Sequence, residues 1–284
     1  MRNKVTASMN GAISIVNAVA TGNGSALGIS LKVIVDLELK SGYGIECNEM
    51  KEDILVRNIL YNTLPKEIID NNLISINIKS EIPRGFGLKS SSAVSNAISL
   101  ACNKLVTDEI DDQIVLNSAI NASLDAKITV TGAYDDSAAC YFGGFVVTDN
   151  YARRLIRREK APDNLHAIIF IPQNILRGNI SKLSVMSELF TDAFKLAESG
   201  EYWKAMKLNG ILLSASLSSR YEPILSALEK GALAASISGN GPSIAAVAYE
   251  DVIDDIKSAF AEFEGIIIVS KVNNQKACVK RIVG

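Results

Sequence analysis

The sequence predicts an α+β protein with two lobes, because strand-like apolar runs and helix-like apolar patterns alternate along its 284 residues. A chain of this length holds two domains of typical size, about 100–150 residues each. We expect a first lobe over residues 1–155 and a second over residues 156–284. The sequence has no proline-rich linker, repeat or low-complexity tract, so the boundary is placed only within about 149–165.

In the first lobe, strands and helices are expected to form a sheet covered by helices. The clearest helix covers residues 91–105, where apolar side chains recur three or four positions apart. The strands are expected near residues 12–19, 31–39, 73–80 and 143–148, and the other helices near residues 50–62 and 112–127.

The second lobe is expected to open after Pro162 with a strand at residues 167–171. Helices are then expected near residues 180–199, 201–217, 222–230 and 251–263, and strands near residues 233–238, 243–249, 265–272 and 277–283. Strands and helices alternate here too, which indicates a second α+β unit.

Charge and composition exclude several classes of function. The net charge is −2, and acidic and basic residues are interspersed. A protein that binds nucleic acid through its phosphates would show a basic stripe, so we expect no nucleic-acid partner. The one histidine, His166, precedes an apolar run and is interpreted as structural. We therefore expect neither a zinc site with histidine ligands nor Ser-His-Asp catalysis.

The cysteines and the apolar segments indicate a cytoplasmic protein. The four cysteines lie far apart without a ligand pair, which is typical of thiols in a reducing compartment: Cys47, Cys102, Cys140 and Cys278. No run of about 18 apolar residues occurs, so we expect no membrane span. Polar residues such as Asn10 and Asn17 interrupt the N-terminal apolar stretch, which fits a signal peptide poorly.

A glycine-rich turn followed by three serines is the most informative segment of the chain. Residues 83–93 read Pro-Arg-Gly-Phe-Gly-Leu-Lys-Ser-Ser-Ser-Ala and lead directly into the expected helix. Gly85 and Gly87 allow close approach of a ligand to the backbone. A helix that begins near Ser91 or Ser92 would direct its free N–H groups at an anion. The segment therefore predicts a phosphate-binding loop, although a capped loop-to-helix junction would have the same pattern.

Two further segments have the composition of functional turns. Residues 131–136 read Thr-Gly-Ala-Tyr-Asp-Asp and precede Gly143-Gly144, and residues 238–243 read Ser-Gly-Asn-Gly-Pro-Ser between two apolar runs. Taken alone, the first segment is a cluster of helix-capping residues and the second is a turn between strands.

The three segments, in this order, resemble the GHMP kinases, the family named for galactokinase, homoserine, mevalonate and phosphomevalonate kinases. The resemblance implies a two-lobed fold with a ribosomal-protein-like N-terminal lobe, which contains a left-handed βαβ crossover, and a ferredoxin-like C-terminal lobe. It implies ATP as the phosphate donor and Mg²⁺ as the metal ion. The ATP-binding residues would be Pro83, Arg84, Gly85, Phe86, Gly87, Leu88, Lys89, Ser90, Ser91 and Ser92.

The resemblance also implies catalytic and metal-binding roles. The catalytic aspartate of the family lies seven residues before a Gly-Gly pair, a spacing that selects Asp136 as the base, with Asp135 as the alternative. Lys89 would help to neutralise the transferred phosphoryl group. Ser91 and Asp125 would bind Mg²⁺, although Asp125 replaces the usual Glu and is otherwise interpreted as an exposed charge on a helix.

Within the family, the chain resembles the archaeal shikimate kinases. The shared segments are Gly-Leu-Lys-Ser-Ser-Ser, Thr-Gly-Ala-Tyr-Asp-Asp and residues 16–28. The resemblance implies transfer of the γ-phosphate of ATP to the 3-hydroxyl of shikimate in aromatic amino acid biosynthesis. Substrate would be bound by Asn17, Thr21, Asp135, Ser238, Gly239, Asn240 and Gly241. The arginine that holds the shikimate carboxylate stays open among Arg153, Arg154 and Arg177.

Two alternatives remain open at this point. The first is another small-molecule kinase of the same family, although residues 8–12 lack the usual Pro-Gly-Lys and homoserine kinases typically have Asn in place of Asp136. The second is a nucleotide-binding sensor that has lost turnover, which the presence of Asp136 and Ser91 disfavours. The sequence does not give the oligomeric state.

Overall fold

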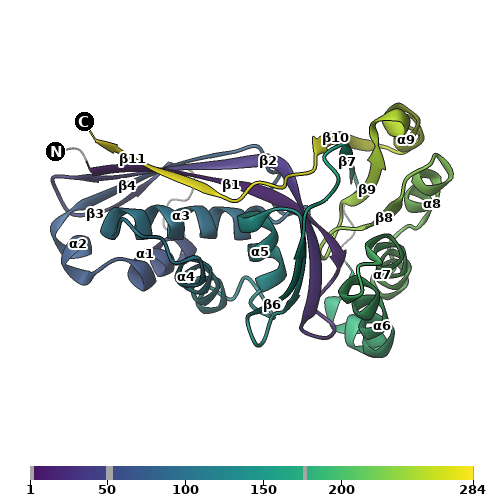
Figure 1. The fold of residues 1–284 in the computed structure, drawn as a ribbon, viewed down its shortest axis with the longest axis horizontal. Helices are drawn as coiled ribbons and strands as arrows, with labels where there is room; N and C mark the ends of the chain where they lie inside the picture. The colour runs from purple at the N-terminus through teal and green to yellow at the C-terminus, as the bar shows by residue number, and fades with distance from the viewer. Residues whose placement is uncertain (1–2, 49–53, 175–177, 284) are drawn as a thin grey trace.

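The computed structural model describes residues 3–48, 54–174 and 178–283. Within these ranges the chain forms a seven-stranded sheet and a four-stranded sheet, and each sheet carries its own set of helices (Figure 1). The predicted α+β arrangement is therefore confirmed.

The larger sheet is built around a long antiparallel pair, β1 (Asn3–Val16) and β2 (Asn23–Lys40). Its main path runs β11-β1-β2-β4-β3, and β5 and β6 branch from the other half of β2. The remaining strands of this sheet are β3 (Gly44–Cys47), β4 (Leu73–Ser80), β5 (Phe145–Asp149), β6 (Arg154–Glu159) and β11 (Cys278–Val283). Alternate residues of β2, such as Val33 and Val35, are fully buried, as expected for a strand with one face on the core.

Helices cover one face of this sheet (Figure 1). They are α1 (Ile54–Thr63), α2 (Lys66–Asn71), α3 (Ser90–Val106), α4 (Asp112–Asp125) and α5 (Tyr134–Phe142). The central helix, α3, packs on β1 and β2. Its fully buried residues include Ala93, Ala97 and Ala101, whose small side chains let the helix lie close to the sheet.

The smaller sheet is antiparallel, with the order β10-β7-β9-β8. Its strands are β7 (Leu165–Pro172), β8 (Ala234–Ile237), β9 (Ile244–Tyr249) and β10 (Gly265–Lys271). Its helices are α6 (Ser187–Glu198), α7 (Tyr202–Leu217), α8 (Glu222–Glu229) and α9 (Ile253–Ala261), with two 3₁₀ helices, η1 (Ile180–Met186) and η2 (Glu250–Val252).

Most predicted elements occur, and the differences have physical reasons. The strand predicted at 12–19 overlaps the end of β1, which starts much earlier, at Asn3, and ends at Val16. The short elements β3, α2 and β6 were not predicted, since four to six residues carry little periodicity. The helix predicted at 180–199 divides into η1 and α6. The first residues of the helix predicted at 50–62 lie outside the described residues.

The last strand, β11, joins the larger sheet. It pairs antiparallel with β1, from Asn3 opposite Val283 to Ser8 opposite Cys278. Residues 278–283 therefore complete the sheet begun by the first strand of the chain, while the boundary predicted at residue 155 stays a prediction.

A bilayer crossing would need a longer and more apolar helix than any that the described residues form.

The Gly143-Gly144 pair lies at a junction of three backbone segments. The N–H of Gly28 in β2 donates to the carbonyl of Gly144 at 3.0 Å, and the N–H of Gly144 donates to the carbonyl of Asn273 at 2.7 Å. The N–H of Asn273 in turn donates to the carbonyl of Gly28 at 2.9 Å. Because α5 ends at Phe142, this junction fixes the C-terminal end of the helix that carries Asp135 and Asp136.

We predict that Gly144→Ala destabilises the protein more than Gly231→Ala does. Both glycines have positive φ, 69° and 93°, so both changes incur the left-handed cost of about 1–2 kcal/mol. A Cβ at Gly144 would lie 2.2 Å from the carbonyl oxygen of Glu159, whereas at Gly231 it would meet only the Val252 side chain at 3.3 Å. Urea denaturation should show an additional loss of about 1–3 kcal/mol for Gly144→Ala. Equal losses would contradict this account.

Candidate active site

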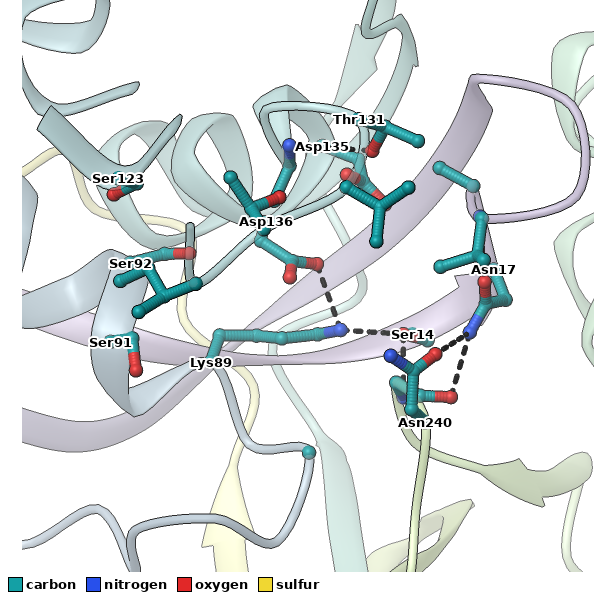
Figure 2. Close-up of a pocket in the computed structure, with 18 of the residues that line it drawn as sticks. Ser14, Asn17, Lys89, Ser91, Ser92, Ser123, Thr131, Asp135, Asp136 and Asn240 are labelled. Carbon is teal, nitrogen blue, oxygen red and sulfur yellow. Dashed lines mark hydrogen bonds and ion pairs between the residues drawn. The ribbon is translucent and has the colours of Figure 1, made fainter. Parts of the chain in front are cut away.

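A cavity of about 450 Å³ lies where parts of both lobes meet. Its wall comes from the end of β1 and the residues after it, the loop before α3 with the first turn of that helix, the segment between α4 and α5 with the first turn of α5, and the loop between β8 and β9. All three segments singled out in the sequence therefore contribute residues to one cavity (Figure 2).

The glycine-rich loop has the backbone conformation that its composition predicts. Gly85 and Gly87 have φ values of 79° and 80°, and Lys89, the residue before α3, has a φ of 64°. The helix begins at Ser90, slightly earlier than expected. Of the predicted ATP-binding residues, those that line the cavity are Gly85, Gly87, Leu88, Lys89, Ser90, Ser91 and Ser92, whereas Pro83, Arg84 and Phe86 are not among its lining residues.

The two glycine loops of the two lobes contact each other. The hydroxyl of Ser238 donates to the carbonyl of Gly87 at 2.8 Å, and the hydroxyl of Ser243 donates to the carbonyl of Phe86. A Cβ at Gly87 would lie 1.9 Å from the carbonyl oxygen of Ser238. Gly87 is therefore required for contact between the loops as well as for its conformation. Ser238 contacts the first glycine loop but does not line the cavity.

Lys89 extends into the site instead of pointing to solvent. Its side chain is 5% exposed, and its Nζ lies 2.8 Å from Oδ1 of Asp136 and donates to Oγ of Ser14 at 2.8 Å (Figure 2). Burial lowers the pKa of Lys89, but attraction to Asp136 and Asp135 outweighs it and leaves the pKa raised. Lys89 therefore stays a cation. Sequence reasoning missed Ser14, which belongs to no recognised motif.

The two adjacent aspartates have different environments. The side chain of Asp136 is 20% exposed and faces the cavity beside Lys89 (Figure 2). Asp135 is only 4% exposed. Burial and the neighbouring charge of Asp136 raise the pKa of Asp135 to about 7, while Lys89 and a hydrogen bond from Asn150 act in the opposite direction. Both aspartates lie in the first turn of α5, so the start of this helix forms part of the cavity wall.

Asn17 lines the cavity, but its side chain holds the second glycine loop. Its Nδ2 donates to the carbonyl of Gly239 at 2.8 Å and to Oδ1 of Asn240 at 3.0 Å, and its Oδ1 accepts from the N–H of Val19. The backbone N–H of Asn17 donates to Oδ1 of the fully buried Asn209, another residue that sequence reasoning missed. Gly239, Asn240 and Gly241 line the cavity as predicted.

The structure does not bring every predicted residue to the cavity. Asp125 is exposed, lies 3.5 Å from Nδ2 of Asn62 on α1, and is not a lining residue; Ser123 on the same helix lines the cavity instead. Successive helical residues point about 100° apart, so a spacing of eleven positions could not decide which one faces inward. Thr21 bonds within its own turn, through Asn23, and is likewise not a lining residue.

Two of the arginines proposed for the substrate carboxylate, Arg153 and Arg154, are not among the residues that line the cavity. Arg153 donates to Asn117 and Asn121 on α4, and Arg154 is exposed on β6. Arg177 lies outside the described residues. Among the described residues that line the cavity, the cations are Lys89 and Lys127.

The chain matches known proteins over most of its length. The family model for the GHMP kinases N terminal domain matches residues 55–144, and the one for GHMP kinases C terminal matches residues 194–265. A shikimate kinase from Methanobrevibacter smithii is 37% identical over 276 residues, 93% of this chain and 95% of that protein. A shikimate kinase from Methanothermobacter thermautotrophicus is 37% identical over 284 residues, 96% of each.

Solved structures confirm the fold that the sequence resemblance implies. A homoserine kinase from Cytophaga hutchinsonii matches with a TM-score of 0.72 and 22% identity, covering 98% of this chain and 97% of its own. The mevalonate kinase of Methanococcus jannaschii matches with a TM-score of 0.75 and 15% identity, covering 96% of this chain and 98% of its own.

We predict that Asp135→Asn stabilises the protein more at pH 8 than at pH 5. The pKa of Asp135 rises from an ordinary 3.8 to about 7 on folding. Between these values the folded state holds a proton that the unfolded state has lost, so this carboxyl lowers stability as the pH rises to about 7. Asparagine does not titrate. Thermal melts of both proteins at pH 5 and pH 8 measure the effect, with Asp70→Asn on α2 as the control for net charge. A pH-independent difference would contradict the prediction.

Proposed function

This chain belongs to the GHMP kinases, and on that basis we propose that it transfers the γ-phosphate of ATP to the 3-hydroxyl of shikimate, giving shikimate 3-phosphate and ADP. The observation that carries the reaction type is the Lys89–Asp136 ion pair in a cavity bounded by two glycine loops. The acceptor is supported by 37% identity to shikimate kinases over nearly the whole chain.

The phosphates of ATP are proposed to lie at the start of α3. The first N–H groups of this helix have no partner within the helix, and they carry the positive end of its dipole. Ser91 and Ser92 add hydroxyl donors at the same place, and glycines before the helix keep the approach free of side chains. A chain of net charge −2 thus holds a polyanion through local backbone and side-chain groups.

Asp136 is proposed as the group that accepts or orients the proton of the acceptor hydroxyl. A carboxylate can accept this proton, and Oδ1 of Asp136 lies 2.8 Å from Nζ of Lys89. Phosphoryl transfer depends mainly on positioning and charge neutralisation, and Lys89 supplies a fixed positive charge beside the base. Asp135 could act as the base only if its side chain reached the acceptor hydroxyl. Its side chain is buried against Gly24 and Asn150, which disfavours such contact.

The donor set at the cavity fits Mg²⁺ bound together with ATP. The described residues contain no cluster of three or more His, Cys, Asp or Glu, so they form no all-protein metal cage. Mg²⁺ typically takes most of its ligands from phosphates and water, and the hydroxyl of Ser91 at the start of α3 would be a protein ligand. The bound ion would neutralise phosphate charge. Asp125 lies outside the cavity and does not complete such a site.

The rest of the cavity has the polarity that a hydroxylated acid requires. Asn240 and Thr131 offer polar groups on the side of Asp136 away from α3. Two of the described lysines line the cavity, and Lys89 is paired with Asp136. The other is Lys127, on the segment between α4 and α5. We assign it to the carboxylate of shikimate, in place of the arginines suggested by the sequence.

We predict that Asp136→Asn lowers kcat by roughly 10²–10⁴-fold, the range typical of losing a general base. The affinity for ATP should change little, because the phosphates are held at α3. Asp135→Asn should retain kcat within about tenfold. Steady-state kinetics and ATP titration of both variants make the comparison. The reverse order of effects would identify Asp135 as the base.

The acceptor is tested by ADP release from Mg-ATP with shikimate, homoserine, mevalonate or galactose. We expect turnover with shikimate and a product heavier by one phosphoryl group. Turnover with another acceptor would support the proposed site but show that shikimate is not the substrate. Tight ATP binding without turnover on any of the four would favour a nucleotide sensor.

A further inference from the structure

Asn150 is a buried residue next to the site that no motif contains. It follows β5 at the turn into β6 and is 2% exposed. Its side-chain Nδ2 donates to Oδ1 of Asp135 at 2.8 Å and to Oγ1 of Thr131 at 3.1 Å. Its Oδ1 accepts from the backbone N–H of Asp135 at 3.0 Å and from the hydroxyl of Thr148 at 2.8 Å. Two donors and two acceptor positions are thus all used.

The contacts fix which way the amide of Asn150 points. A backbone N–H can only donate, so the atom of Asn150 that meets the N–H of Asp135 is the oxygen. The other atom is then the NH₂ group, and it meets the carboxylate of Asp135. The amide of asparagine can accept from the backbone N–H and donate to the carboxylate of one residue at the same time.

Asn150 also takes the place of a missing helix cap. The N-cap position of α5 is Ala133, whose side chain makes no cap hydrogen bond. A usual N-cap side chain accepts from the N–H two or three residues ahead. Asp135 is two residues after Ala133, and Oδ1 of Asn150 accepts from its N–H. The helix that carries both aspartates is therefore capped from a distant turn.

The same residue connects the cap to the start of β2. The backbone N–H of Asn150 donates to the carbonyl of Gly22 at 2.8 Å, just before β2. Gly24 packs directly on Asp135, because a Cβ there would lie 2.4 Å from Oδ2. Asp135 is thus held from Asn150 on one side and from β2 on the other, while its neighbour Asp136 points into the cavity toward Lys89 (Figure 2).

We propose that Asn150 is a positioning residue for the catalytic carboxylate: by capping α5 and holding Asp135 at two points, it sets where Asp136 meets the acceptor hydroxyl. This inference rests on the proposed role of Asp136 in phosphoryl transfer. A displacement of about 1 Å at a reacting group can cost about 10²-fold in rate, so the hold on Asp135 has a measurable consequence.

The test is an exchange of the amide and the carboxylate between the two positions. Asn150→Asp keeps the oxygen that caps α5 but places a carboxylate against Asp135, and it should lower kcat about 10–100-fold with KM for ATP within about twofold. In the double variant D135N/N150D the hydrogen bond between the two side chains is restored in the opposite direction, since the amide at position 135 now donates to the carboxylate at position 150. It should recover kcat to within about threefold of Asp135→Asn alone.

A second asparagine–aspartate pair, in which the aspartate is exposed, controls for the change of charge. Nδ2 of Asn274 donates to Oδ1 of Asp163 at 2.8 Å and Asn274 also bonds the backbone of Ala161, away from the cavity. Asn274→Asp creates the same kind of carboxylate pair there. It should lower Tm without lowering kcat at a temperature where the protein stays folded.

Three results would overturn the proposal: unchanged kcat in Asn150→Asp, a double variant no faster than Asn150→Asp, or a drop in kcat for Asn274→Asp equal to that for Asn150→Asp. If Asn150→Asp does not fold, Asp135→Asn is compared with D135N/N150D, and a difference above tenfold would overturn it. All rates use the acceptor that the unaltered protein phosphorylates, so an error in the proposed acceptor leaves this comparison intact.

Discussion

One cation and two adjacent carboxylates lie together at the wall of the cavity, and much of the surrounding structure keeps these charges paired. Lys89 reaches them because it leaves the loop in a left-handed conformation immediately before α3, so that its side chain runs beside β1 to Ser14 and Asp136. Burying a charge without a partner is costly. Asp136 is matched by Lys89, and Asp135 is matched by an amide donor from Asn150. The site is thus held by contributions from α3, β1, α5 and the β5–β6 turn together.

Local signals in the sequence were sufficient for the parts of the site that depend on backbone conformation. Gly85, Gly87 and the Gly143-Gly144 pair occupy positions with positive φ, and the serines after Lys89 start a helix, as their composition predicts. The GHMP kinase fold and most strands and helices were also predictable. By contrast, Ser14, Asn150 and Asn209 act through contacts between residues distant in the chain, and a single sequence carries no signal for such pairs. The metal-binding role of Asp125 stays a prediction; Asp125 is not among the residues that line the cavity, and a spacing along the chain does not say which face of a helix is turned inward.

The two lobes are joined at the site by polar contacts between backbone and small side chains. Ser238 and Ser243 bond the carbonyls of the first glycine loop, Ser14 accepts from the N–H of Gly239, and Asn17 holds the carbonyl of Gly239. Small residues allow this close approach, and each bond uses a loop group that would otherwise be buried without a partner. The cavity therefore owes its shape to a contact between loops, and this explains why serine, asparagine and glycine dominate both segments.

The pairing of β11 with β1 affects the order in which the protein can be completed on the ribosome. Residues 3–8 form their outer hydrogen bonds with residues 278–283, which are synthesised after the other described strands of both sheets. Until then one edge of the larger sheet has unpaired backbone groups, while its other strands and helices are already available to fold. Open sheet edges are sites of unwanted association between nascent chains. Strand β11 thus covers residues 3–8 and becomes the edge of the sheet in their place, and a translation product that stops before residue 278 would present the backbone groups of residues 3–8 to other proteins in the cell.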